Sequence, residues 1–201
     1  MPVETVIFLD VLDRLKAETR AEHTAMEDTL GIMGDDLVLT HYRQLLERYF
    51  GFYAPVEARL ADVLGVAPPG GLDLQARRKL ALLRADLVAL GGPAADTLAV
   101  CTALPPLRTP AQAMGCLYVL EGATLGGVVI GRHVQRTLGL TPDSGARFFH
   151  GNGAHTAELW RTFRAALAGF AVNPGSADVV VESANATFRS LRQWCLREPA
   201  A

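Results

Sequence analysis

Hydrophobic residues recur at intervals of three and four along most of the chain, which is the spacing of one face of an α-helix. Proline and glycine clusters separate these segments, and a β-branched run at residues 179–181 is the single ambiguous stretch. The pattern predicts an all-α fold in one domain, residues 1–201, with about six or seven helices. The expected helices cover residues 4–30 (one helix or two collinear pieces), 37–64 after an N-cap at residues 34–36, 73–90, 110–139, 154–171 and 176–197, with residues 148–153 as a loop.

The fourth predicted helix contains four glycines within ten residues, at Gly122, Gly126, Gly127 and Gly131. Each interior glycine destabilises a helix by about 1 kcal/mol relative to alanine, so the four together give up roughly 4 kcal/mol. Three explanations are open: close packing of another helix, a membrane span with Gly-x-x-x-Gly spacing, or a flat ligand lying against bare backbone. Glu121 in the middle of the segment, and the lack of a second comparable segment, argue against the membrane span.

Composition excludes several classes of protein. The net charge is −2, from 19 basic and 21 acidic residues spread along the chain, so no basic block indicates binding to nucleic acid or to a membrane. The three cysteines are odd in number and lack C-x-x-C spacing, which argues against a disulfide framework and a cysteine zinc site. The apolar stretch at residues 6–9 is too short for a signal peptide. We therefore expect a cytoplasmic protein.

A candidate partner for a flat ligand lies in the first predicted helix, at His23. Thr19 and Met26, at i−4 and i+3, place His23 on the face that should turn inward. Glu27, at i+4, can accept a hydrogen bond from the imidazole Nδ1 and leave Nε2 free to bind iron. Lys16 shares this face and can neutralise an anionic group. A lone histidine on such a face is more often a structural residue, so spacing alone leaves both interpretations open.

Two segments together resemble the signature helices of the biliverdin-producing heme oxygenases. The second is most similar to the bacterial branch, which includes enzymes that supply biliverdin to bacteriophytochromes. The segments are Lys16, Thr19, His23, Thr24 and Glu27 in the first helix, and Tyr-Val-Leu-Glu-Gly-Ala-Thr-Leu-Gly-Gly at residues 118–127. The resemblance continues at residues 159–162 and 184–194 and covers nearly the whole chain, although residues 64–110 match only in helical character.

The resemblance implies a helical bundle in which heme lies between a proximal and a glycine-rich distal helix. It also implies oxidative cleavage of heme, both cofactor and substrate, to biliverdin, carbon monoxide and ferrous iron. His23 would be the axial iron ligand, and Lys16 and Arg161 would hold the propionates. The other implied heme-binding residues are Thr19, Glu27 and Phe188, and the implied catalytic residues of the distal helix are Gly122, Thr124, Gly126 and Gly127.

One position departs from the family pattern. Many members have an aspartate after the first distal glycine, where it organises water, and here that residue is Ala123. Thr124, Arg132 or Glu121 are the candidates to hold the water instead. This departure supports an alternative function, a heme-binding or regulatory protein that does not degrade heme. A helical enzyme acting on a thiamine-like substrate, or a pure interaction module, does not explain His23, Glu27 and the glycines together.

The implied partners are heme, dioxygen and an external electron donor such as a ferredoxin or a reductase. No flavin or dinucleotide motif occurs in the sequence, which indicates that the donor is another protein. A bacteriophytochrome that receives the biliverdin is a further implied partner.

Overall fold

The structure, a computed structural model, describes residues 10–197. Over these residues the fold is all-α, as predicted, and residues 179–181 are helical. The α-helices are α1 (Val11–Glu18), α2 (Arg20–Leu30), α3 (Leu39–Leu64), α4 (Leu80–Ala89), α5 (Pro110–Leu138), α6 (Arg147–His150), α7 (Thr156–Phe170) and α8 (Pro174–Cys195). Short 3-10 helices are η1 (Pro69–Gly71), η2 (Gln75–Arg77), η3 (Ala95–Thr97) and η4 (Gly153–His155).

The first predicted helix is two collinear pieces, α1 and α2, which meet at Thr19. Its residues 4–9 lie outside the described residues. Thr19 is buried, and both its backbone N–H and its hydroxyl donate to the carbonyl of Leu15, at 3.0 and 2.7 Å. A threonine hydroxyl that bonds back to the i−4 carbonyl loosens the helical ladder, which accounts for the break. Gly31 ends α2 in the left-handed conformation, as predicted.

The predicted start of the second helix was wrong. It begins at Leu39, and no side chain caps it, so the acidic residues at 35 and 36 are not its N-cap. Residues 34–37 instead form a turn in which the Leu37 N–H donates to the Gly34 carbonyl, and Leu37 is buried in the core. Burial of this leucine fixes the turn ahead of the helix. Pro55 lies inside α3, which continues past it.

The prediction of one helix over residues 73–90 was wrong in its first half. Asp73 caps only the single turn η2, and α4 begins at Leu80. The first N–H groups of α4 are bonded to the carboxylate of Glu57 on α3, where Leu80 N–H donates at 3.2 Å. A carboxylate from a distant helix therefore acts as the N-terminal cap, which local sequence does not reveal.

Residues 148–153, predicted as a loop, include most of the one-turn helix α6. The backbone N–H groups of Arg147 and Phe148 donate to the two carboxylate oxygens of Asp86 on α4, at 2.8 and 2.7 Å. Burial raises the pKa of Asp86, and these hydrogen bonds oppose the rise. The buried carboxylate holds α6 in place against α5.

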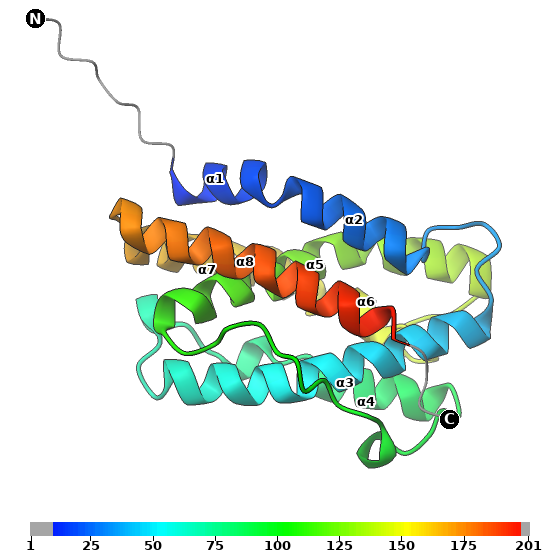
Figure 1. The fold of residues 1–201 in the computed structure, drawn as a ribbon. Coiled ribbons are helices and arrows are strands. Elements are labelled where there is room, and N and C mark those ends of the chain that lie inside the picture. The colour runs from blue at the N-terminus through cyan, green and yellow to red at the C-terminus, as the bar shows by residue number, and fades with distance from the viewer. Residues whose placement is uncertain (1–9, 198–201) are drawn as a thin grey trace, which may run out of the picture.

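The helices are arranged around α8. Figure 1 shows α1 and α2, in blue, along one side of α8, in orange to red, with α3 and α4 beyond its other side. The most extensive helix contact is between α5 and α8. Gly115 permits it, because a Cβ there would lie 2.9 Å from the Ser183 Cβ and 3.0 Å from the Ala184 nitrogen. Close packing of two helix backbones at this glycine positions the following half of α5.

By length and composition α5 is the one helix among the described residues that could cross a membrane. Half of its most apolar window is buried inside the protein, against α8, α6 and α7. Apolar side chains remain exposed in its second half, at Leu125, Val128 and Val129. The apolar composition of α5 therefore reflects a core helix with one uncovered face.

Candidate functional site

The residues singled out in the first predicted helix share one side of α1 and α2. Lys16, His23 and Glu27 are exposed, so the prediction that His23 turns inward was wrong, and Thr19 is buried at the junction. The His23 side chain is 56% exposed, and its Nδ1 lies 3.4 Å from Glu27 Oε2. This is the contact that the i,i+4 spacing predicts. A hydrogen bond formed across this contact would orient the ring by Nδ1 and leave Nε2 as the available ligand atom.

The helix α8 holds this side of α2 in position. The edge of the Phe188 ring meets the His23 ring at a centroid distance of 5.6 Å and an interplanar angle of 84°. One residue earlier on α2, Glu22 accepts hydrogen bonds from Arg189 and Arg192, both at 3.3 Å. The imidazole is therefore in contact with an aromatic ring of α8. The helix that carries it is joined to α8 by two ion pairs of Glu22.

The glycines at positions 122, 126, 127 and 131 of α5 differ in their surroundings. A Cβ added to Gly122 or Gly126 would have nothing within 4 Å, apart from the neighbouring backbone, so these two face open space. A Cβ at Gly127 would lie 2.7 Å from the Phe149 carbonyl oxygen, whereas a Cβ at Gly131 would lie 3.7 Å from the same residue, an ordinary contact distance. Close packing on α6 therefore accounts for Gly127, and packing does not account for Gly122 and Gly126.

Thr124 and Glu121 lie away from the open glycine face. At about 100° per residue, Thr124 is rotated about 200° from Gly122 around α5. Its hydroxyl donates to the Leu120 carbonyl at 3.3 Å, and its methyl group packs toward Gly151. Ala123 is exposed and offers no polar side chain. The open face of α5, which we define as Gly122, Leu125, Gly126 and Val129, is formed by backbone and apolar side chains.

Polar contacts join the α2 segment to α5 on both sides of this open face. At one end the Tyr118 hydroxyl is within reach of the Thr19 hydroxyl, which opposes the rise in the pKa of Tyr118 caused by burial. At the other end His133 Nε2 lies 3.1 Å from the Gly34 carbonyl, just after α2. Tyr118 and His133 are about 22 Å apart along α5, at 1.5 Å per residue. Between these ends α2 and α5 each pack on α8 rather than extensively on each other.

Two arginines of α7 compete for the role predicted for Arg161. The Arg161 side chain is 74% exposed, and its guanidinium lies 3.8 Å from Glu158. Arg164, one turn later, is close enough to Tyr118 for its charge to lower the pKa of that hydroxyl against the dominant effect of burial. Sequence reasoning did not single out Arg164, and the effect of its charge on the pKa of Tyr118 makes it a second candidate.

A buried ion pair lies behind the distal glycines. Arg77 of η2 and Glu121 of α5 meet at 2.7 Å, with side chains 4% and 5% exposed. Arg77 also donates to the Leu159 carbonyl and the Thr162 hydroxyl of α7, at 3.1 and 2.9 Å. Burial raises the pKa of Glu121, and the charge of Arg77 opposes the rise. The sequence did not reveal this pair, because its partners are 44 residues apart.

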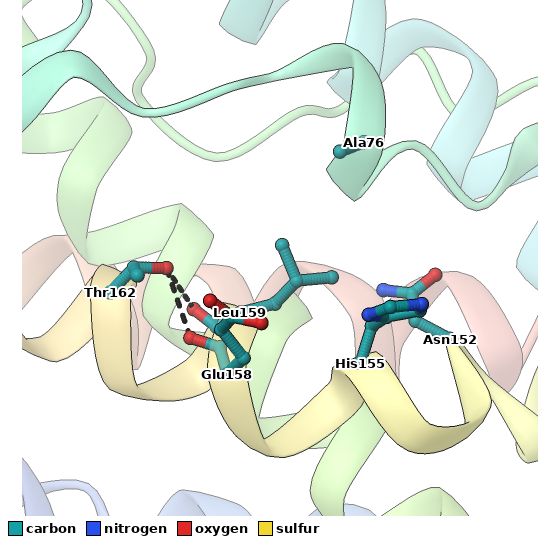
Figure 2. A pocket seen from close by; sticks show the side chains of 6 residues that line it. All are labelled: Ala76, Asn152, His155, Glu158, Leu159 and Thr162. Atoms are coloured by element: carbon teal, nitrogen blue, oxygen red, sulfur yellow. Dashed lines mark hydrogen bonds between the residues drawn. The ribbon is translucent and has the colours of Figure 1, made fainter.

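A hollow of about 420 Å³ lies elsewhere, between η2 and the start of α7. Figure 2 shows the Leu159 side chain pointing toward Ala76, with His155 and Asn152 beside each other at one end. The Thr162 hydroxyl bonds back to the carbonyls of α7. None of the six lining residues belongs to α1, α2, α5 or α8, so this hollow is separate from the open face of α5.

The arrangement around the open face fits an iron porphyrin. An exposed imidazole next to a carboxylate could donate one ligand atom to an iron whose other ligands come from a porphyrin. The bare backbone at Gly122 and Gly126 provides a flat wall that any side chain would fill. Among the described residues no cluster of three or more His, Cys, Asp or Glu could hold a metal ion. A single histidine is what iron already bound in a macrocycle requires.

A model of the protein family described as heme oxygenase matches residues 9–197. The chain belongs to the heme oxygenase family. A curated heme oxygenase from Xanthomonas campestris pv. campestris is 37% identical over 95 residues. That alignment spans 47% of this chain and 53% of the relative, so the chain matches about half the length of this curated protein.

Solved structures share the fold of this heme oxygenase family member. The heme oxygenase of Neisseria meningitidis, solved with NO and CO bound, has a TM-score of 0.74 at 22% identity and covers 96% of each chain. A Synechocystis heme oxygenase in complex with heme has a TM-score of 0.72 at 16% identity, over 93% of this chain and 91% of that one. The Leptospira interrogans enzyme has a TM-score of 0.71 at 19% identity, over 93% and 98%.

Matched glycine substitutions test the two faces of α5. We expect Gly126→Ala to stabilise the ligand-free protein by up to about 1 kcal/mol, because alanine is the better helix former and the new methyl group meets open space. We expect Gly127→Ala to destabilise it by about 1 to 3 kcal/mol, because the methyl group is forced against the Phe149 backbone. Urea denaturation measures both. Equal effects of the two substitutions would contradict the assignment of faces.

A second pair of variants tests the buried ion pair. Glu121→Ala leaves the buried Arg77 guanidinium without its carboxylate, so we expect a loss of about 3 to 5 kcal/mol in the free energy of unfolding. Glu158→Ala removes the partner of Arg161 in an exposed ion pair and should change stability little. Thermal or urea denaturation of the two variants gives the comparison, and a small loss for Glu121→Ala would show that Arg77 is not dependent on it.

Proposed function

We propose that this heme oxygenase family member cleaves heme oxidatively to biliverdin, carbon monoxide and ferrous iron, with dioxygen and electrons from a separate donor. The observation that carries the proposal is the open face of α5, with glycines that packing does not explain, together with an exposed His23 on α2 whose Nδ1 lies 3.4 Å from Glu27. Heme degradation is the function of the family. Heme is therefore both the group that this site binds and the substrate.

His23 would bind the heme iron through Nε2. Glu27 lies 3.4 Å from Nδ1, and a hydrogen bond from that nitrogen to the carboxylate would fix the tautomer and raise the basicity of the ligand atom. Phe188 limits rotation of the imidazole through its T-shaped contact with the ring. Thr19 lies one turn before His23 on the same side of the helix and interacts with the Tyr118 hydroxyl. When bound, heme would supply the chemistry that activates dioxygen.

The open face of α5 would cover the other side of the porphyrin. Because Gly122 and Gly126 have no side chains, the backbone can approach closely, and its carbonyl oxygens have a second lone pair that a water molecule can reach. Leu125 and Val129 add apolar surface that excludes bulk water at the edges. The side of α5 that carries Gly127 packs against α6. Thr124, which was predicted to hold water, lies on this packed side.

Basic residues near the Tyr118 end would hold the heme propionates. Lys16 is exposed on the face of His23, and α1 packs on α7, which carries both Arg161 and Arg164. A guanidinium binds a carboxylate through two parallel hydrogen bonds and an ammonium acts as a point charge, so either arginine can complement Lys16. Of the two arginines, Arg164 is favoured because its charge acts on the Tyr118 hydroxyl and lowers the pKa of that group.

The proposal extends to location and partners. We infer a soluble cytoplasmic protein that takes electrons from a ferredoxin or a reductase and releases biliverdin, which a bacteriophytochrome can use. A second candidate function is heme binding without degradation. The observation that favours it is the absence of an acidic side chain at Ala123, together with Thr124 and Glu121 being engaged elsewhere.

Hemin titration followed by reduction separates these functions. We expect the purified protein to form a Soret complex, and addition of ascorbate or a ferredoxin system in air to bleach it while biliverdin absorption grows. His23→Ala should weaken the complex and change its ferric spectrum, because the axial ligand is lost. His155→Ala, an exposed histidine at the separate hollow, is the matched control and should behave as wild type.

A Soret band that stays stable under reducing conditions in air would support the heme-binding alternative. Failure to form a Soret complex at all would contradict both functions. An unchanged ferric spectrum in His23→Ala would reject His23 as the ligand while leaving heme binding intact.

Charge removal on α1 and α7 tests the propionate site. We expect Lys16→Met and Arg164→Met each to raise the hemin dissociation constant by about three- to tenfold, in line with loss of a charge-assisted hydrogen bond. Arg161→Met should have the smaller effect, because Arg161 is largely exposed and paired with Glu158. Fluorescence quenching by hemin measures all three. A larger effect of Arg161→Met than of Arg164→Met would restore Arg161 as the propionate ligand.

A further inference from the structure

His133 is a buried histidine that the proposed reaction does not use. Its side chain is 3% exposed, and it lies on α5 ten residues after Ala123, about 15 Å along the helix. Its hydrogen bonds assign a role to each ring nitrogen. The Gly34 carbonyl can only accept, so Nε2 donates to it at 3.1 Å. The Arg136 guanidinium can only donate, so Nδ1 accepts from it at 2.9 Å.

The Gly34 carbonyl belongs to the loop that follows α2, the helix that carries His23. α2 ends at Leu30, and the next residues turn toward α3 with Ile32 and Leu37 buried in the core. A second contact supports the first, because Arg136 also lies 3.6 Å from Asp35. His133 and Arg136 thus tie two consecutive residues of this loop, Gly34 and Asp35, to α5.

The rest of α2 has no comparable connection to α5. The helix breaks from α1 at Thr19, and its ion pairs, from Glu22, run to α8. The side chains of His23 and Glu27 are more than half exposed, so they do not pack α2 onto α5. The hydrogen bond between His133 and the Gly34 carbonyl therefore joins the loop after α2 directly to α5.

We propose that His133 is a positioning residue that fixes the width of the heme cleft by tying the loop after the proximal helix to the distal helix. The proposal rests on the proposed function, since it takes the space between α2 and the open face of α5 as the heme site. Loss of the tie lets the end of α2 move away from α5. The distance between the His23 ligand atom and the glycine wall then varies, and bound heme escapes more easily.

Two substitutions at His133 separate its hydrogen bonds from its bulk. His133→Phe fills the space but neither donates to Gly34 nor accepts from Arg136. His133→Gln can do both, because its amide has N–H donors and a carbonyl acceptor. Arg136→Met, at a side chain that is 70% exposed, removes one half of the tie without disturbing the core. Urea denaturation of each variant shows which proteins are folded under the conditions used.

Hydrogen exchange of the ligand-free protein measures how firmly the contacts of His133 and Arg136 hold the loop after α2, and it does not require heme. We expect the amides of residues 27–37 to exchange about tenfold faster in His133→Phe, with wild-type rates in His133→Gln and intermediate rates in Arg136→Met. The amides of α8 should keep their wild-type rates in all three. Wild-type exchange in His133→Phe, or equal acceleration in His133→Phe and His133→Gln, would overturn the proposal.

Transfer of hemin from the loaded protein to excess apomyoglobin gives the second measurement. We expect dissociation about tenfold faster for His133→Phe, about threefold faster for Arg136→Met, and near wild type for His133→Gln. Faster exchange of residues 27–37 with unchanged hemin dissociation would show that the tie does not control the cleft. If wild-type protein bound no hemin the proposed function would fail, while the exchange experiment would still show whether His133 holds the loop. If His133→Phe does not fold, the Arg136→Met and His133→Gln results decide.

Discussion

The close packing of α5 on α8 is the constraint on which the candidate site depends. Gly115 lets the two backbones approach, and α8 carries on its other side the groups that hold α2, namely Phe188, Arg189 and Arg192. One helix thus sets the position of both walls of the site. A shift of α8 moves the imidazole of His23 and the distal glycines together. The distance between α2 and α5 therefore depends on the helix α8 that both of them contact.

The distal helix combines low intrinsic stability with strong tertiary support. Four glycines weaken it by roughly 4 kcal/mol, and the bundle holds it on the side opposite the open face. Phe149 packs against Gly127, and the buried Arg77–Glu121 pair joins α5 to η2 and α7. Lys79, buried nearby with its pKa lowered by burial, lies close enough to Glu121 to interact with it. Support from one side leaves the other side free to be bare backbone, which is what close approach to a flat ligand requires.

The proximal wall is held in a different way. α2 is a short segment separated from α1 at Thr19. It places Met26 and Leu30 in the core and contacts α8 through the ion pairs of Glu22 and the Phe188 ring. It is therefore held mainly by α8 and by the loop contact at its end, whereas α5 packs on several helices.

Local signals in the sequence were sufficient for the helical class, for the bounds of α5 between its Thr109 cap and Gly139, and for the His23–Glu27 contact at i,i+4. These depend on residues within one or two helical turns, and local spacing determines them. Only the tertiary structure decided which glycines face open space, where α4 begins, and which arginine of α7 lies near Tyr118. Each of these depends on a group brought from a distant segment, such as the Phe149 carbonyl or the Glu57 carboxylate. Burial of such polar partners is a property of the packed bundle, and no short-range pattern encodes it.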